Sequence, residues 1–316
     1  MNRFKHGARR FGLAMLGVAA AILVGCGGGS EPIEPFVPKR IMAFGDESSA
    51  ITAQGKKYTI NALDANSQLA CYNNPIWVQS LASHFGLVFP QCNPEAIAAP
   101  QGQMFAKAGA KVADVRAQLD VFFSTGSFNA HDLVAMMAGS NDILELYSQF
   151  PAVSRDSLIN SARDLGKQWA AQVNRVADSG GRVVVPTLPD MGVTPYALKE
   201  KLAKQDTDRA KLLTDLTTEF NTYFRLNIRN DGRVIGLVLA DEMTQTATRY
   251  PAAFGYANVT DGACLTTVAI TDCTTKTLLV DSNQETWLWA NDTLMSPGGQ
   301  SRLGQLALQR AVGNPF

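Results

Sequence analysis

Histidine is scarce in this chain, and two other features are missing, an excess of charge of one sign and an apolar run long enough to cross a membrane. Only three of the 316 residues are histidines, and none follows His131, so the second half of the chain lacks the commonest general base. The 28 basic residues balance the 28 acidic ones, which argues against a nucleic-acid-binding protein. The apolar run from Phe11 to Val24 is too short to span a bilayer comfortably.

The N-terminus has the pattern of a secretory signal. Basic residues between Arg3 and Arg10 precede the apolar run, as such signals require. The run ends in Leu23-Val24-Gly25-Cys26, which resembles the bacterial lipobox. That resemblance implies removal of residues 1–25 and acylation of Cys26. Because Gly27, and not aspartate, follows the cysteine, it also implies sorting to the outer membrane. We expect residues 26–39, rich in glycine and proline, to form a flexible linker.

Besides Cys26, four cysteines remain after the signal, and the mature chain would have a net charge of about −4. An even number of cysteines in an oxidising compartment favours two disulfides. The sequence allows three pairings, of which we favour Cys71–Cys92 and Cys264–Cys273, because each pair lies within one irregular segment. No cysteine spacing matches a zinc site, and no histidine is near.

From Arg40 to Phe316 the pattern predicts one α/β domain. Continuous apolar runs are typical of strands that are buried on both faces. Four such runs are 40–44, 133–138, 182–186 and 234–240. Apolar residues at three- and four-residue spacing predict helices at 76–85, 112–123, 154–179, 206–227 and 301–312. Alternating strands and helices indicate a parallel sheet covered on both faces, with its chemistry at the carboxyl ends of the strands.

Six motifs in order resemble the SGNH or GDSL hydrolases, in particular their lipase and esterase branch. They cover essentially the whole chain after Lys39. The motifs are Phe44-Gly45-Asp46, the Gly109 segment 105–110, Gly139-Ser140-Asn141-Asp142, the stretches 188–195 and 250–259, and Ser296-Pro297-Gly298-Gly299-Gln300. The resemblance implies a three-layer α/β/α, flavodoxin-like fold over residues 40–316 with a mainly parallel five-stranded sheet.

The family's catalytic positions are replaced here. In the family, a serine after the first strand attacks an acyl carbonyl, and a glycine amide and an asparagine side chain stabilise the oxyanion. Gly109 and Asn141 match those two donors, but Glu47 stands at the nucleophile position. Asn291 and Leu294 stand where the family's aspartate and histidine belong. If the alignment to the family motif is shifted by one residue, Asp292 stands at the aspartate position, but Met295 then stands at the histidine position.

Ser48 is the alternative nucleophile if the turn is displaced by one residue, and Ser49 is a weaker candidate. No histidine pairs with either in sequence. His131 precedes a strand and is expected about 20 Å from its functional end. His84 is expected at the end of a surface helix.

Other arrangements remain open. Asp46 and Glu47 could form an acid and base pair, although adjacent residues rarely project at the required separation. Glu47, Asn141 and Asp292 could offer oxygen ligands to a metal. We expect Asp142 and Asp190 to serve in turns and caps. Trp77, Trp287 and Trp289 would line an acyl groove or, more simply, pack in the core.

Two functional hypotheses follow. The first is a catalytically degenerate envelope hydrolase that binds an acyl, lipid or glycan-linked ligand, or serves as a scaffold. The second is an active carboxylic ester hydrolase that uses Ser48. In both cases we expect no cofactor, no resident metal and no nucleic acid, with the membrane contacted through the lipid on Cys26; the protein partner is left open.

Overall fold

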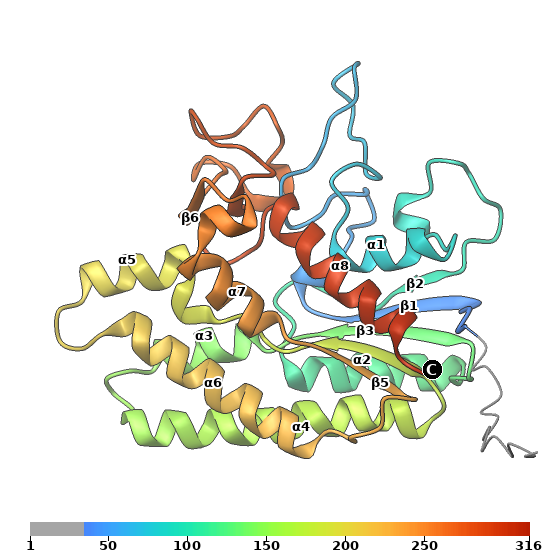
Figure 1. Cartoon of the computed structure of the whole chain (residues 1–316), viewed down its shortest axis with the longest axis horizontal. Coiled ribbons are helices and arrows are strands. Elements are labelled where there is room, and N and C mark those ends of the chain that lie inside the picture. The colour runs from blue at the N-terminus through green and yellow to red at the C-terminus, as the bar shows by residue number, and fades with distance from the viewer. Residues whose placement is uncertain (1–34) are drawn as a thin grey trace, which may run out of the picture. The chain divides into compact units, whose positions relative to one another are not determined.

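Five parallel strands form the central sheet, in the order β2-β1-β3-β4-β5 (Figure 1). The computed structural model describes residues 35–316. The strands are β1 Arg40–Gly45, β2 Gly102–Met104, β3 Asp132–Met137, β4 Arg182–Pro186 and β5 Ile235–Val238. The apolar residues of β1, β3 and β4 are buried, as a sheet covered on both faces requires. The three-layer fold with a five-stranded parallel sheet is therefore confirmed.

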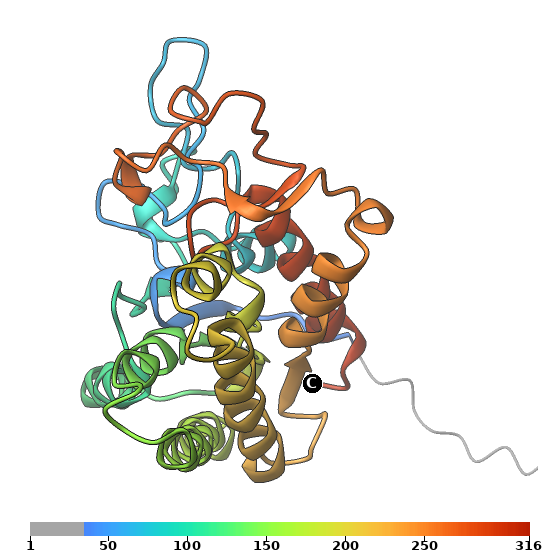
Figure 2. The same cartoon turned by 90° about the vertical axis from the view of Figure 1, so that its left-hand side faces the viewer.

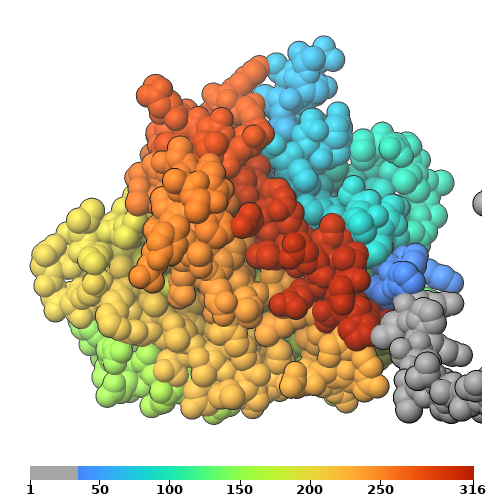
Figure 3. Space-filling model, viewed as in Figure 1, coloured from blue at the N-terminus to red at the C-terminus, as the bar shows by residue number. Residues whose placement is uncertain are grey.

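Helices cover the two faces of the sheet separately (Figures 1 and 2). On one face, Met42 and Val134 pack in a core with side chains from α2, α3, α4, α5 and α6. On the other, Ile41 and Leu133 pack with α1, α7 and α8. Figure 3 shows α8 as a red ridge across this second face. The bounds are α1 Trp77–His84, α2 Val112–Thr125, α3 Ser140–Ser148, α4 Arg155–Asp178, α5 Pro195–Ala203, α6 Arg209–Asn227, α7 Ala240–Arg249 and α8 Pro297–Gly313.

The predicted strand 234–240 is too long at both ends. β5 begins at Ile235 and ends at Val238, and Ala240 already starts α7. The apolar run crosses this boundary without a break, whereas Asp241 and Glu242 supply the acidic first turn that favours a helix start. Helices α3, α5 and α7 and the short strand β2 were not predicted from the sequence.

Two long irregular segments rise from the carboxyl-end side of the sheet and lie side by side (Figures 1 and 2). The first follows β1, and the second lies between α7 and α8. The second contains the two-stranded sheet of β6 Asn258–Gly262 and β7 Trp287–Trp289. Disulfides Cys71–Cys92 and Cys264–Cys273 hold these segments, in the pairing favoured from the sequence.

The proposed signal peptide, Cys26 and most of the linker lie outside the described residues. Within residues 35–316, none of the helices combines the length and apolar character needed to span a bilayer.

Candidate functional site

The turn after β1 is held in one conformation by a glycine and a glutamine. Gly45 has a φ of +131°, and a Cβ there would lie 1.8 Å from the carbonyl oxygen of Met137, so a side chain is excluded. The N–H of Gly45 donates to Oε1 of the buried Gln118 at 2.8 Å, and Nε2 of Gln118 donates back to the Gly45 carbonyl at 2.9 Å. Helix α2 thereby fixes where the next residues project.

Glu47 projects toward Gly109 and Asn141, the two donors to which the family resemblance assigns an oxyanion. It begins a short 3-10 helix, Glu47–Ser49, directly after β1. Its Oε2 accepts a hydrogen bond from the backbone N–H of Gly109 at 2.7 Å and another from Nδ2 of Asn141 at 3.1 Å. Gly109 follows β2 and Asn141 lies in the first turn of α3, so the carboxyl ends of three neighbouring strands meet at this carboxylate.

Two buried carboxyl groups lie beneath Glu47. Burial, and next the charge of Glu47, raise the pKa of Asp46 well above its ordinary value. Oδ1 of Asp46 accepts from the N–H of Ser48 at 2.9 Å, and Oδ2 has no hydrogen-bond partner among the described residues. Burial raises the pKa of Asp142 to about 6, although its Oδ2 accepts from the N–H of Val112 at 3.0 Å. Asp46 therefore caps the turn after β1, and Asp142 caps the start of α2, a role of the kind expected for it.

Asn291 and Leu294 form a closed turn rather than an acid and base pair. Oδ1 of Asn291 accepts from the N–H groups of Thr293 at 3.0 Å and Leu294 at 2.8 Å. The Leu294 side chain is buried. Asp292 is paired instead with Lys199 on α5, with 2.5 Å between Oδ1 and Nζ. This segment therefore presents an amide and an ion pair where the family would present its aspartate and histidine.

Ser48 and Ser49 are both buried, with Ser48 retaining 8% of its surface. The hydroxyl of Ser49 accepts from the indole N–H of Trp77 at 3.1 Å, which ties it into the core. The histidines in residues 35–316 are His84 and His131, and both are exposed. His84 ends α1, and His131 precedes β3, at the end of the strand opposite to Asn141.

Two of the three candidate groove tryptophans pack in the core, and the possible metal ligands are not all brought together. Trp77 and Trp289 are almost fully buried and Trp287 is half-buried, so the first two pack in the core. Glu47 and Asn141 are brought together, but Asp292 is held by Lys199. Within the described part of the chain, no group of three or more acidic, histidine or cysteine side chains is placed to hold a metal.

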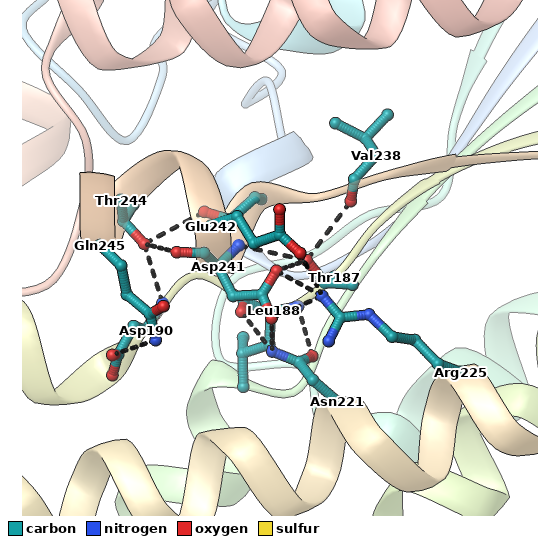
Figure 4. A network of polar contacts seen from close by, with 11 residues as sticks. Thr187, Leu188, Asp190, Asn221, Arg225, Val238, Asp241, Glu242, Thr244 and Gln245 are labelled. Carbon is teal, nitrogen blue, oxygen red and sulfur yellow. Dashed lines mark hydrogen bonds and ion pairs between the residues drawn. The ribbon is translucent and has the colours of Figure 1, made fainter. Parts of the chain in front are cut away.

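Asp190 belongs to a buried polar network at the ends of β4 and β5 (Figure 4). Its carboxylate accepts from the N–H of Gly192 at 2.8 Å and from Nε2 of Gln245 at 2.9 Å. Nearby, Asp241 accepts from the hydroxyl of Thr187 at 2.7 Å and from Arg225 at 2.7 and 2.8 Å. These groups satisfy one another, so the network attaches the 188–195 motif to α6 and α7.

Tyr58 and Thr59 also contribute to this region, although no sequence motif indicates them. Burial, and next the charge of Glu47, raise the pKa of Tyr58, so its phenol stays neutral beside the site. The hydroxyl of Thr59 donates to the carbonyl of Met295 at 2.8 Å, which joins the segment after β1 to the Asn291 turn. The contact spans 236 residues, and no local pattern signals it.

A family model described as GDSL-like Lipase/Acylhydrolase matches residues 41–257. No curated protein matches the chain. Among solved structures, Axe2, an acetylxylan esterase from Geobacillus stearothermophilus, is similar at 11% identity, covering 88% of this chain and 96% of that chain with a TM-score of 0.43. A member of the lipolytic G-D-S-L family from Veillonella parvula is similar at 11% identity, covering 85% and 96%, with a TM-score of 0.41.

Proposed function

Since the chain belongs to the GDSL-like lipase and acylhydrolase family, we propose that it is a catalytically degenerate member that binds a ligand, or serves as a scaffold, in the cell envelope. One observation supports this above all others: the Glu47 carboxylate accepts from both Gly109 and Asn141. In the family, the two matching groups hold the developing oxyanion.

The occupied donors account for the loss of activity in this proposal. Oxyanion stabilisation requires donors that are free for the transition state, and one such donor contributes about 3–4 kcal/mol. A resident carboxylate already uses both donors and would repel a second negative oxygen. Loss of the nucleophile or the base leaves only the small residual catalysis of a dismantled triad.

The direct test is hydrolysis of p-nitrophenyl acetate and butyrate by the purified protein and its Ser48→Ala variant. We expect both proteins to show only the background rate of the buffer. Turnover that disappears in Ser48→Ala would overturn the proposal and support the alternative, an ester hydrolase with a displaced nucleophile. The burial of Ser48 and the exposed positions of His84 and His131 disfavour that alternative.

The envelope location is part of the proposal and rests on the sequence. Acylation of Cys26 would tether the domain through the linker, and several acyl chains would be needed for stable anchoring. We expect Cys26→Ser to move the protein from the membrane fraction to the soluble fraction of cells. A variant that stays in the membrane fraction would show that another feature anchors the protein.

A further inference from the structure

A cavity of about 270 Å³ lies beside the Asn291 turn and is separate from the Glu47 carboxylate. Three parts of the chain build it: Lys199 of α5, the loop closed by the Cys264–Cys273 disulfide, and the Asn291–Asp292 segment. Its volume falls just below the 300–1,000 Å³ range typical of drug-sized ligands, so a molecule with one ring fits better than a long chain.

One wall of the cavity is apolar. Leu265, Val268, Ile270 and Leu279 line it, and Leu265 keeps 37% of its surface exposed. The disulfide loop is held in place from outside, because Nδ2 of the buried Asn61 donates to the carbonyls of Thr271 at 3.2 Å and Cys273 at 3.3 Å. The apolar wall is thus preformed, which lowers the cost of ordering it around a ligand.

The other wall is polar and carries charges of both signs. Lys199 pairs with Asp292 at 2.5 Å. Hydrogen bonds from Asn258 and Thr260, and the nearby charge of Lys199, lower the pKa of Asp261, which stays ionised. Two carboxylates therefore face one ammonium group, a net charge that disfavours an anionic ligand.

Asn291 adds a free donor to this wall. Its Oδ1 is used by the N–H groups of Thr293 and Leu294, whereas its Nδ2 has no hydrogen-bond acceptor among the described residues. The wall therefore offers carboxylate acceptors together with amide and ammonium donors. A hydroxyl group can both donate and accept, so a neutral polyol matches this set without breaking the Lys199–Asp292 pair.

We propose that this cavity binds one neutral sugar ring, with hydroxyls on the Asn291 and Asp261 side and a C–H face against Leu265 and Val268. The inference deepens the proposed function, since it names the ligand class for a protein that binds rather than hydrolyses. A fatty acid is excluded by charge, and a bare metal ion by the apolar wall.

The test is ligand-observed NMR on the purified protein with named probes. These are the methyl glycosides of glucose, galactose, mannose, xylose and N-acetylglucosamine, with methyl glucuronide and hexanoate as anionic comparators. We expect saturation transfer to at least one neutral glycoside and none to the two anions. Absence of binding to every neutral glycoside, or binding of the anions alone, would overturn the inference.

Asn291→Asp provides a specific variant, because Oδ1 can still accept from Thr293 and Leu294 while the Nδ2 donor is lost. We expect glycoside affinity to fall about tenfold, as for loss of a partner to a desolvated group. Asn283→Asp is the matched control, since Oδ1 of Asn283 forms the same kind of turn with Glu285 and Thr286 outside the cavity lining.

Leu265→Ser tests the apolar wall. The variant should also bind glycosides more weakly, because the C–H face of the sugar loses an apolar contact. Binding that is equal in the native protein, Asn291→Asp and Leu265→Ser would place the sugar elsewhere and overturn the inference. The ester assay on the same samples keeps the two proposals apart. Ester turnover contradicts the proposed function, whereas missing glycoside binding without turnover contradicts only the ligand class.

Discussion

Asn141 donates a hydrogen bond from its side-chain amide to the carboxylate of Glu47, at 3.1 Å, and the same nitrogen donates to the carbonyl of Ala110, also at 3.1 Å. Both N–H donors of the amide are therefore used within the protein. Ester hydrolysis also yields a carboxylate, so the Glu47 side chain occupies the two donors as a bound product would, but it is covalently part of the chain. The replacement of serine by Glu47 therefore removes the nucleophilic hydroxyl and also occupies the two oxyanion donors.

Restoring the nucleophile alone should not restore hydrolysis. Glu47→Ser frees Gly109 and Asn141 but supplies no base, since Leu294 remains apolar. We expect Glu47→Ser to match the native protein on p-nitrophenyl acetate, and the triple variant with Asn291→Asp and Leu294→His to gain measurable turnover. Asp at 291 can keep the turn that Oδ1 makes. Rapid turnover by the single variant would show that a base is already present.

Removing the Glu47 side chain should open a site for small carboxylates. In Glu47→Ala, the N–H of Gly109 loses its acceptor and Nδ2 of Asn141 keeps only the Ala110 carbonyl, so acetate can take the place of the carboxylate. We expect acetate to raise the Tm of Glu47→Ala above its value in chloride at equal ionic strength, because a ligand that binds the folded state stabilises it. The native protein should show no such difference.

Glu47→Gln is the matched control for that experiment. The glutamine amide oxygen can still accept from Gly109 and Asn141, so the donors stay occupied. Acetate should therefore leave its Tm unchanged. An equal acetate effect in Glu47→Ala, Glu47→Gln and the native protein would locate acetate binding away from this site.

Asp142 should make the protein less stable as the pH rises through the acidic range. Burial raises its folded-state pKa from 3.8 to about 6, so the folded state holds a proton that the unfolded state has lost. The stabilisation is complete below about pH 4 and is lost as the pH rises through about 6. Asp142→Asn keeps an acceptor for Val112 and should flatten this decline, a gain of roughly 1–3 kcal/mol at pH 7.

Urea unfolding of the native protein and Asp142→Asn at intervals between pH 4 and pH 7 measures the effect. A variant that keeps the native pH profile would assign the titration to another group. Asp46 would then be the first candidate, because burial and Glu47 raise its pKa too.

Lys57 should be essential to the segment that follows β1. Its buried ammonium donates to the carbonyls of Cys71 at 3.0 Å, Asn73 at 2.6 Å and Asn74 at 2.7 Å. Lys57→Met keeps the apolar stem but leaves the carbonyls of Asn73 and Asn74 without their donor, whereas that of Cys71 still accepts from Nε2 of Gln79. The loss should cost about 2 kcal/mol or more in unfolding free energy.

Lys56→Met is the neighbouring control, because Lys56 pairs with Asp272 at the surface. An exposed pair of this kind contributes less than ~1 kcal/mol. Urea unfolding of both variants with the disulfides intact gives the comparison. Equal losses in the two variants would show that the Lys57 contacts add nothing beyond a surface ion pair.

The parts of the fold that the sequence predicted are those with a strong local pattern. The runs at β1, β3 and β4 are long and apolar, and the helical spacing of α2 and α4 repeats over several turns. Strand β2 has three residues, Gly102–Met104, and no apolar run of its own. It exists because β1 offers it a partner edge, which is a property of the assembled sheet.

The candidate site divides in the same way. The sequence by itself determined which residue types stand at the family's positions: Glu47 for serine, Asn291 and Leu294 for aspartate and histidine, and no histidine after His131. Only the tertiary structure decided that the Glu47 carboxylate turns onto Gly109 and Asn141, 62 and 94 residues away in the chain. Parallel strands bring the ends of β1, β2 and β3 to one edge of the sheet, and contacts made there are not encoded in any local stretch of sequence.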